Sequence, residues 1–280
     1  MAYRASFNHC KSGVFQHQST TKVSLLRRTY ATTPDGTPVT ATNRAEATLK
    51  RFWKTVGIDS KPDGLAVTLD KRTLKTPSGN ALIVPHKKRL VATLIANEWE
   101  NQDKVLKAHA LPVTSLASRA IDSLREEQTR EEVNTSLLKY FETDTICFHE
   151  DKPSALVRLQ DLHWKPLLDW VQKDLNIEVK VHTSLLGTDQ PAETKARLAE
   201  TLKSFDEWQL AAMERATFTT KSFLIALALV RGKINVEQAA QAAHVEVNSQ
   251  IEKWGEVEDS HDVDYQDIRR QLGSVACIVS

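Results

Sequence analysis

The spacing of the apolar residues differs between the front and the rest of this chain, and this difference limits the folds open to it. Around residue 67, larger aliphatic side chains alternate with smaller or polar ones: Leu65, Val67 and Leu69 against Ala66, Thr68 and Asp70. This period of two is typical of a strand with one buried face. From Leu111 onward the apolar residues recur at helical spacing. We therefore predict an α+β protein, with a small N-terminal α/β domain that holds an antiparallel sheet and a mostly α-helical C-terminal bundle.

Turn-forming residues divide the sheet region into short segments. The Asp70-Lys71 region and residues 77–80, Pro-Ser-Gly-Asn, are suited to turns and favour a small antiparallel meander. Helical spacing over residues 86–102 predicts a helix that covers the sheet. A further short helix is expected over residues 45–56, where it would bury Leu49, Phe52, Trp53 and Val56. The N-terminal α+β domain is thus predicted to span residues 47–112 and the helical domain residues 113–280.

The first 34 residues are basic, rich in Ser and Thr, and free of acids. Their charged residues, all ahead of the first acid at Asp35, are Arg4, Lys11, Lys22, Arg27 and Arg28. This composition is typical of a mitochondrial transit peptide. Because Arg28 lies three positions before Ala31, we predict a transit peptide over residues 1–30 and a flexible lead-in over residues 31–46. The alternative is a basic tail that binds nucleic acid.

The rest of the chain argues against several classes of protein. Of 37 Lys and Arg residues, removing these five leaves 32 against 36 acids, a net charge of −4 that favours no nucleic-acid partner. The longest apolar run, at residues 223–230, is eight residues long, whereas a membrane span needs about 20. Cys147 and Cys277, the cysteines outside the first 34 residues, make no disulfide framework or zinc motif. Phosphate-loop, dinucleotide, nucleophile-elbow and HExxH motifs are absent, so binding without a cofactor is favoured over catalysis.

Residues 242–265 contain two histidines and seven acids, a composition that resembles a ligand set. Asn235 with Gln238 is typical of a capping box, and Gly255 is a natural helix end, so a helix is expected between them. If that helix is regular, its core face comprises Val236, Ala240, Ala243, Val247, Ile251 and Trp254. His244 and Glu246 would then point to opposite sides of this face, so the two could not share a metal ion.

Glu246 would stand on a polar flank with Ser249, Gln250 and Lys253, at the edge of the apolar face. The alternative is an ordinary boundary glutamate paired with Lys253. Beyond Gly255, four possible ligands come close together in sequence: Glu258, Asp259, His261 and Asp262. They fit either a metal-assisted site or a solvated acidic turn, although their spacing matches no known metal loop.

Several segments, taken in order over residues 48–262, resemble the family of ATP synthase F1 complex assembly factor 2. They are TLDKRTLKTPSGNALIVP, IANEWENQ, LPVTSLASRAID, YFETDTICF, WKPLLDW and NVEQAAQAAHVEVNSQIEKWG. The resemblance implies a small α/β N-terminal domain joined to a helical bundle. It also implies a non-enzymatic chaperone of the mitochondrial matrix.

Such a chaperone binds the unassembled α subunit of F1, shields the surface that later contacts the β subunit, and releases it for assembly. The family's important glutamate lies eight residues before a Trp-Gly pair, a position that Glu246 occupies here. Two rival hypotheses remain open at this point: a metal-assisted matrix hydrolase that uses the Glu258, Asp259, His261 and Asp262 cluster, and a general holdase without a single client.

Overall fold

The computed structural model describes residues 50–184 and 189–280. These residues belong to one compact unit, Glu46–Ser280. The predicted transit peptide, residues 1–30, and the predicted lead-in, residues 31–46, lie outside the described residues. Within the described residues, no helix is both long and apolar enough to cross a membrane.

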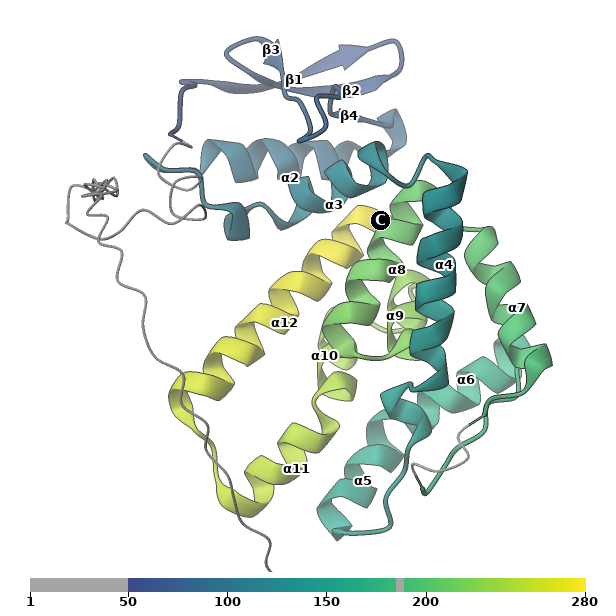
Figure 1. Ribbon diagram of the computed structural model, residues 1–280. Helices are drawn as coiled ribbons and strands as arrows, with labels where there is room; N and C mark the ends of the chain where they lie inside the picture. The colour runs from purple at the N-terminus through teal and green to yellow at the C-terminus, as the bar shows by residue number, and fades with distance from the viewer. Residues whose placement is uncertain (1–49, 185–188) are drawn as a thin grey trace, which may run out of the picture. The chain divides into compact units, whose positions relative to one another are not determined.

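The predicted antiparallel sheet is present near the start of the described chain (Figure 1). Its strands are β1 (Val56–Lys61), β2 (Gly64–Leu69), β3 (Arg72–Thr73) and β4 (Ile83–Val84). The central strand is β2, which pairs with β1 along one edge and with β3 and β4 along the other. Ala66 and Thr68 are buried as well as Val67 and Leu69, so the expected single buried face is wrong for this strand.

Tight turns and a close backbone approach shape the sheet. Asp70 and Lys71 both have positive φ and form the two-residue turn between β2 and β3, the type that suits the twist of paired strands. The Asp70 carboxylate also accepts hydrogen bonds from the backbone N–H groups of Lys54 and Thr55, and these bonds lower its pKa. At Gly64 an added Cβ would lie 2.4 Å from the carbonyl oxygen of Val84, so only glycine permits this close approach of β4.

Helices follow the sheet for the remainder of the described chain. A first set comprises α2 (Arg89–Glu100), α3 (Pro112–Asp122), α4 (Glu127–Glu142), α5 (Ser154–His163) and α6 (Lys165–Leu175). A second set comprises α7 (Ala192–Lys203), α8 (Glu207–Thr220), α9 (Phe223–Val230), α10 (Val236–Ala243), α11 (Val245–Trp254) and α12 (Glu258–Val279). Short 3₁₀ turns lie at His86–Lys88, Ala108–Ala110 and Thr145–Cys147. The α+β fold class is thereby confirmed.

The helix α2 covers the sheet, as predicted, and packs against β1, β2 and β4 (Figure 1). The strongly apolar α9 is buried along its whole length and lies among α4, α6, α8, α10 and α12. A single cluster of buried side chains runs from the sheet into the helices. The division into two domains at residue 112 stays a prediction, because the sheet and the helices share this core.

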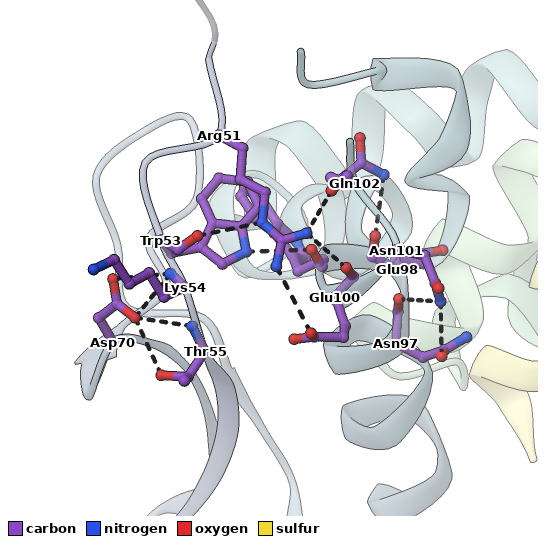
Figure 2. A network of polar contacts seen from close by, with 11 residues as sticks. Arg51, Trp53, Lys54, Thr55, Asp70, Asn97, Glu98, Glu100, Asn101 and Gln102 are labelled. Atoms are coloured by element: carbon purple, nitrogen blue, oxygen red, sulfur yellow. Dashed lines mark hydrogen bonds and ion pairs between the residues drawn. The ribbon is translucent and has the colours of Figure 1, made fainter. Parts of the chain in front are cut away.

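The expected helix over residues 45–56 is wrong where the structure describes it. Residues 51–55 form no helix, and the Arg51 N–H donates to the carbonyl of Lys104. Figure 2 shows the Arg51 side chain donating to the carbonyl oxygens of Trp53, Glu100 and Gln102. Trp53 is buried, but Phe52 is 76% exposed. The bonds to the end of α2 therefore fix this segment in an extended form.

Two charged groups, the buried Lys88 and the half-buried Glu98, connect the sheet region with the helices. Lys88 donates from Nζ to the carbonyl of Ile278, 2.7 Å away in the last turn of α12, where a cation is favoured by the helix dipole. Glu98 accepts from the N–H groups of Val113 and Thr114 and so caps α3 from a neighbouring helix. Burial raises the pKa of Glu98, although these hydrogen bonds oppose the shift.

Candidate functional site

The helix expected from Val236 to Trp254 is interrupted at His244. Its two ends are as predicted, with a full capping box between Asn235 and Gln238 and a positive φ at Gly255. Between them, α10 ends at Ala243 and α11 begins at Val245. The predicted core face is accordingly wrong beyond the break, because Trp254 is 71% exposed whereas Val245 and Ser249 are buried.

A tryptophan from a distant part of the chain accounts for this break. In a continuous helix the carbonyl of Ala242 would accept from the N–H of Glu246. Here it accepts instead from the indole Nε1 of Trp164, at 2.7 Å. Trp164 is fully buried between α5 and α6. It therefore satisfies a carbonyl that the end of α10 would otherwise leave unpaired.

Glu246 lies in the first turn of α11 and is exposed. Its carboxylate makes no hydrogen bond or ion pair within residues 50–184 and 189–280. The predicted polar flank is wrong in one member, because Ser249 is buried. Lys253 does not pair with Glu246 as the alternative required, since its Nζ lies 4.6 Å from the ring centre of Trp254. The carboxylate is thus free to meet a partner while the positive end of the α11 dipole stabilises its charge.

His244 is half-buried at the break between the two helices. Its N–H donates to the carbonyls of Ala240 and Gln241, and its own carbonyl accepts from Asn248. Burial lowers the pKa of His244, and the positive charge of Arg269 lowers it further. The ring therefore favours the neutral form more than a free histidine does, and the residue connects α10 with α11.

The possible metal ligands beyond Gly255 do not lie on a turn as expected. They belong to the first turns of α12, and His261 uses its Nδ1 to accept a hydrogen bond from the N–H of Val257. Across the part of the chain that the structure describes, no three His, Cys, Asp or Glu side chains come together in an arrangement that could hold a metal ion. The structure therefore gives Glu258, Asp259 and Asp262 no shared ligand geometry.

Large apolar side chains are exposed where α11 passes into α12. Those of Trp254, Val257, Val263 and Tyr265 are 71%, 60%, 66% and 47% exposed. The same stretch, residues 246–267, carries eight acids and a single base, Lys253. We call residues 245–267 the α11–α12 segment. Exposed apolar side chains that come close together can form a surface that binds another protein.

The α11–α12 segment is held at its two ends and open between them. The side of α11 carrying Val245 and Ser249 packs against α5, where Arg158 pairs with Glu252. At the other end Arg269 stacks on Tyr265 and pairs with Glu237 of α10. In Figure 1 the connection between the helices lies at the left of the bundle, and α12 runs from it towards the sheet. The first buried residue of α12 is Ile268.

A small sheet, a helical bundle and an exposed segment that is both acidic and apolar define an α+β protein built for binding other proteins. The family described as ATP12 chaperone protein matches residues 50–172. Mitochondrial atp12 of Schizosaccharomyces pombe is 33% identical, with 83% of each chain covered. Mitochondrial ATP12 of Saccharomyces cerevisiae is 31% identical, with 88% of each chain covered. The crystal structure of Atp12 from Paracoccus denitrificans superimposes with a TM-score of 0.71 at 29% identity, covering 84% of this chain and 97% of that one.

The chain belongs to the ATP12 chaperone family. It is accordingly a chaperone and not an enzyme, and the hypothesis of a metal-assisted hydrolase is wrong. The two relatives named above are mitochondrial proteins, which agrees with the transit-like composition of the first 30 residues.

Proposed function

We propose that this chaperone binds the unassembled α subunit of the mitochondrial ATP synthase F1 sector in the matrix, shields the surface that later faces the β subunit, and releases it for assembly. The observation that carries the proposal is the exposed carboxylate of Glu246 on α11, the helix that ends at the exposed Trp254, in a chain that belongs to the ATP12 family. An unassembled subunit exposes an apolar interface that would otherwise aggregate.

A surface of this kind suits a client that must later leave. Contacts of a few apolar side chains and an accessible carboxylate give moderate affinity, and the β subunit can displace the chaperone by burying a larger apolar area. No nucleotide is needed for such an exchange. Capture of newly imported α subunit from matrix extract tests the proposal directly, and failure to capture it would remove the α subunit as client.

Glu246→Lys is expected to weaken binding of the α subunit by about 10-fold or more. Reversal of an interfacial charge removes an attractive contact and puts a repulsive one in its place. The fold should persist, since the side chain is exposed and supports no other group. Binding is measured with purified α subunit, and far-UV circular dichroism checks the fold.

Glu131→Lys is a matched control, because Glu131 is also an exposed glutamate on a helix but lies on α4. Equal loss of affinity in both variants would show a general effect of charge, and unfolding of Glu246→Lys would make Glu246 structural. Equal suppression of aggregation for unrelated proteins and for the α subunit would instead favour a general holdase.

A further inference from the structure

We infer that the α11–α12 segment is the client-docking element, and that the client surface it fits is an apolar hollow bordered by Lys or Arg. The inference rests on the proposed function and adds the part of the chaperone that binds and the chemistry of what it binds. It is carried by exposed apolar side chains that α11 and α12 leave uncovered.

Trp254 ends α11 and Val263 lies in the part of α12 before Ile268, and neither helix covers these two apolar side chains. An indole that is 71% exposed leaves most of its apolar area in water, and binding is favoured in proportion to the apolar area that a partner removes from water. Val257 adds a third apolar group in the connection between the helices. A protein surface that buries these side chains would remove their apolar area from water and so stabilise the complex.

The position of Trp254 is held before any partner arrives. Glu252, two residues earlier, pairs with Arg158 of α5, and the cation of Lys253 lies over the indole ring. At the far side of the connection, the Val257 N–H is bonded to His261. These contacts reduce the conformational freedom that the segment would lose on binding, which favours affinity.

The charge of the α11–α12 segment indicates which partner it binds. The eight acids of residues 246–267 outnumber the one base, for a net charge of −7. A second copy of the chain would bring the same acidic segment and be repelled. The lead-in, residues 31–46, has two acids, Asp35 and Glu46, against one base, Arg44, and offers no attraction. A client with basic residues around an apolar hollow satisfies both features, and its approach would be steered by the acids.

The test measures the affinity of the full chain for purified F1 α subunit at low and at raised ionic strength. Trp254→Ala should weaken binding by about 10-fold or more, as expected for a central aromatic contact. The double variant Asp259→Asn, Asp262→Asn should flatten the salt dependence, because two of the steering charges are removed. Both variants should keep the wild-type circular dichroism spectrum and Tm, because these side chains are exposed.

Leu90→Ala is the matched control, since Leu90 is a 52% exposed apolar residue on α2. It should change affinity by about twofold or less, as peripheral positions do. Wild-type affinity in both segment variants, with the α subunit still bound, would overturn this inference and leave the proposed function standing. Absence of binding by the wild type would remove the proposed function itself.

Two further outcomes would assign the segment to another occupant and so overturn the inference. If light scattering shows that the wild type is a dimer and that Trp254→Ala is a monomer, a second copy of the chain is the occupant. If the client binds only after residues 1–30 are cleaved away, the basic N-terminus is the occupant. A chain that begins at Ala31 supplies this comparison, because it keeps the whole compact unit Glu46–Ser280.

Discussion

Replacement of Trp164 by Ala is expected to lower the free energy of unfolding by about 3 to 5 kcal/mol, the range for a large buried aromatic residue. The side chain is 1% exposed, so its removal opens a cavity between α5 and α6. The same change deprives the Ala242 carbonyl of its indole donor. Urea unfolding followed by circular dichroism measures the loss.

Trp164→Phe separates the hydrogen bond from the cavity. It keeps an aromatic ring but leaves the Ala242 carbonyl unpaired, which costs about 1 to 3 kcal/mol. Trp208→Phe is the matched control, because Trp208 is also 1% exposed and its Nε1 has no hydrogen-bond partner within the described chain. If both Phe variants lose the same stability, the bond to Ala242 contributes nothing. A larger loss for Trp164→Phe, with weaker client binding, would show that this bond also sets the direction of α11.

Asp144→Ala is expected to lower the free energy of unfolding at neutral pH by about 2 to 4 kcal/mol, because it leaves buried donors without an acceptor. Asp144 is completely buried, and its carboxylate accepts from the N–H groups of Ile146 and Leu224. It thereby joins the 3₁₀ turn after α4 to the start of α9. Chemical unfolding at constant pH measures this loss.

The pH dependence of stability gives a second measurement on Asp144. Burial raises the pKa of this carboxyl from 3.8 to about 6, against the opposing effect of hydrogen bonds from Ser222 and nearby N–H groups. The folded state thus holds the proton more tightly than the unfolded state, so the contribution of Asp144 to stability falls as pH rises from about 4 to about 6. At about 1.4 kcal/mol per pKa unit, the change is on the order of 3 kcal/mol.

Asp144→Asn should remove this change while other groups continue to titrate. The informative quantity is therefore the difference between wild type and variant across the pH series, since Glu98 has a raised pKa as well. A difference that stays constant from pH 4 to pH 7 would contradict the raised pKa.

Features that depend on neighbouring residues could be predicted from the sequence. The capping box of Asn235 and Gln238 needs only three residues of separation, and the end of α11 at Gly255 needs only a residue that tolerates positive φ. The period change likewise placed the sheet ahead of the helices.

Features that depend on distant partners could not be predicted. At the break beside His244 the Ala242 carbonyl accepts a hydrogen bond from the indole of Trp164, 78 residues away in sequence. Arg51 holds its segment extended through carbonyls at the end of α2, some 50 residues on, which helix spacing could not reveal. Helical phase, counted on the assumption that one regular helix runs from Val236 to Trp254, therefore wrongly placed Trp254 in the core. The position of Glu246 on the surface stays consistent with the resemblance, whereas its role as a binding residue is still a prediction.

The exposed indole of Trp254 gives this protein a built-in optical reporter. The other tryptophans, Trp53, Trp99, Trp164, Trp170 and Trp208, are all at most 9% exposed, whereas Trp254 is 71% exposed. Emission from the buried rings should lie at shorter wavelength, and a soluble quencher should reach Trp254 first. Docking of a client on the α11–α12 segment would shield that ring, so occupancy could be followed by fluorescence without any added label.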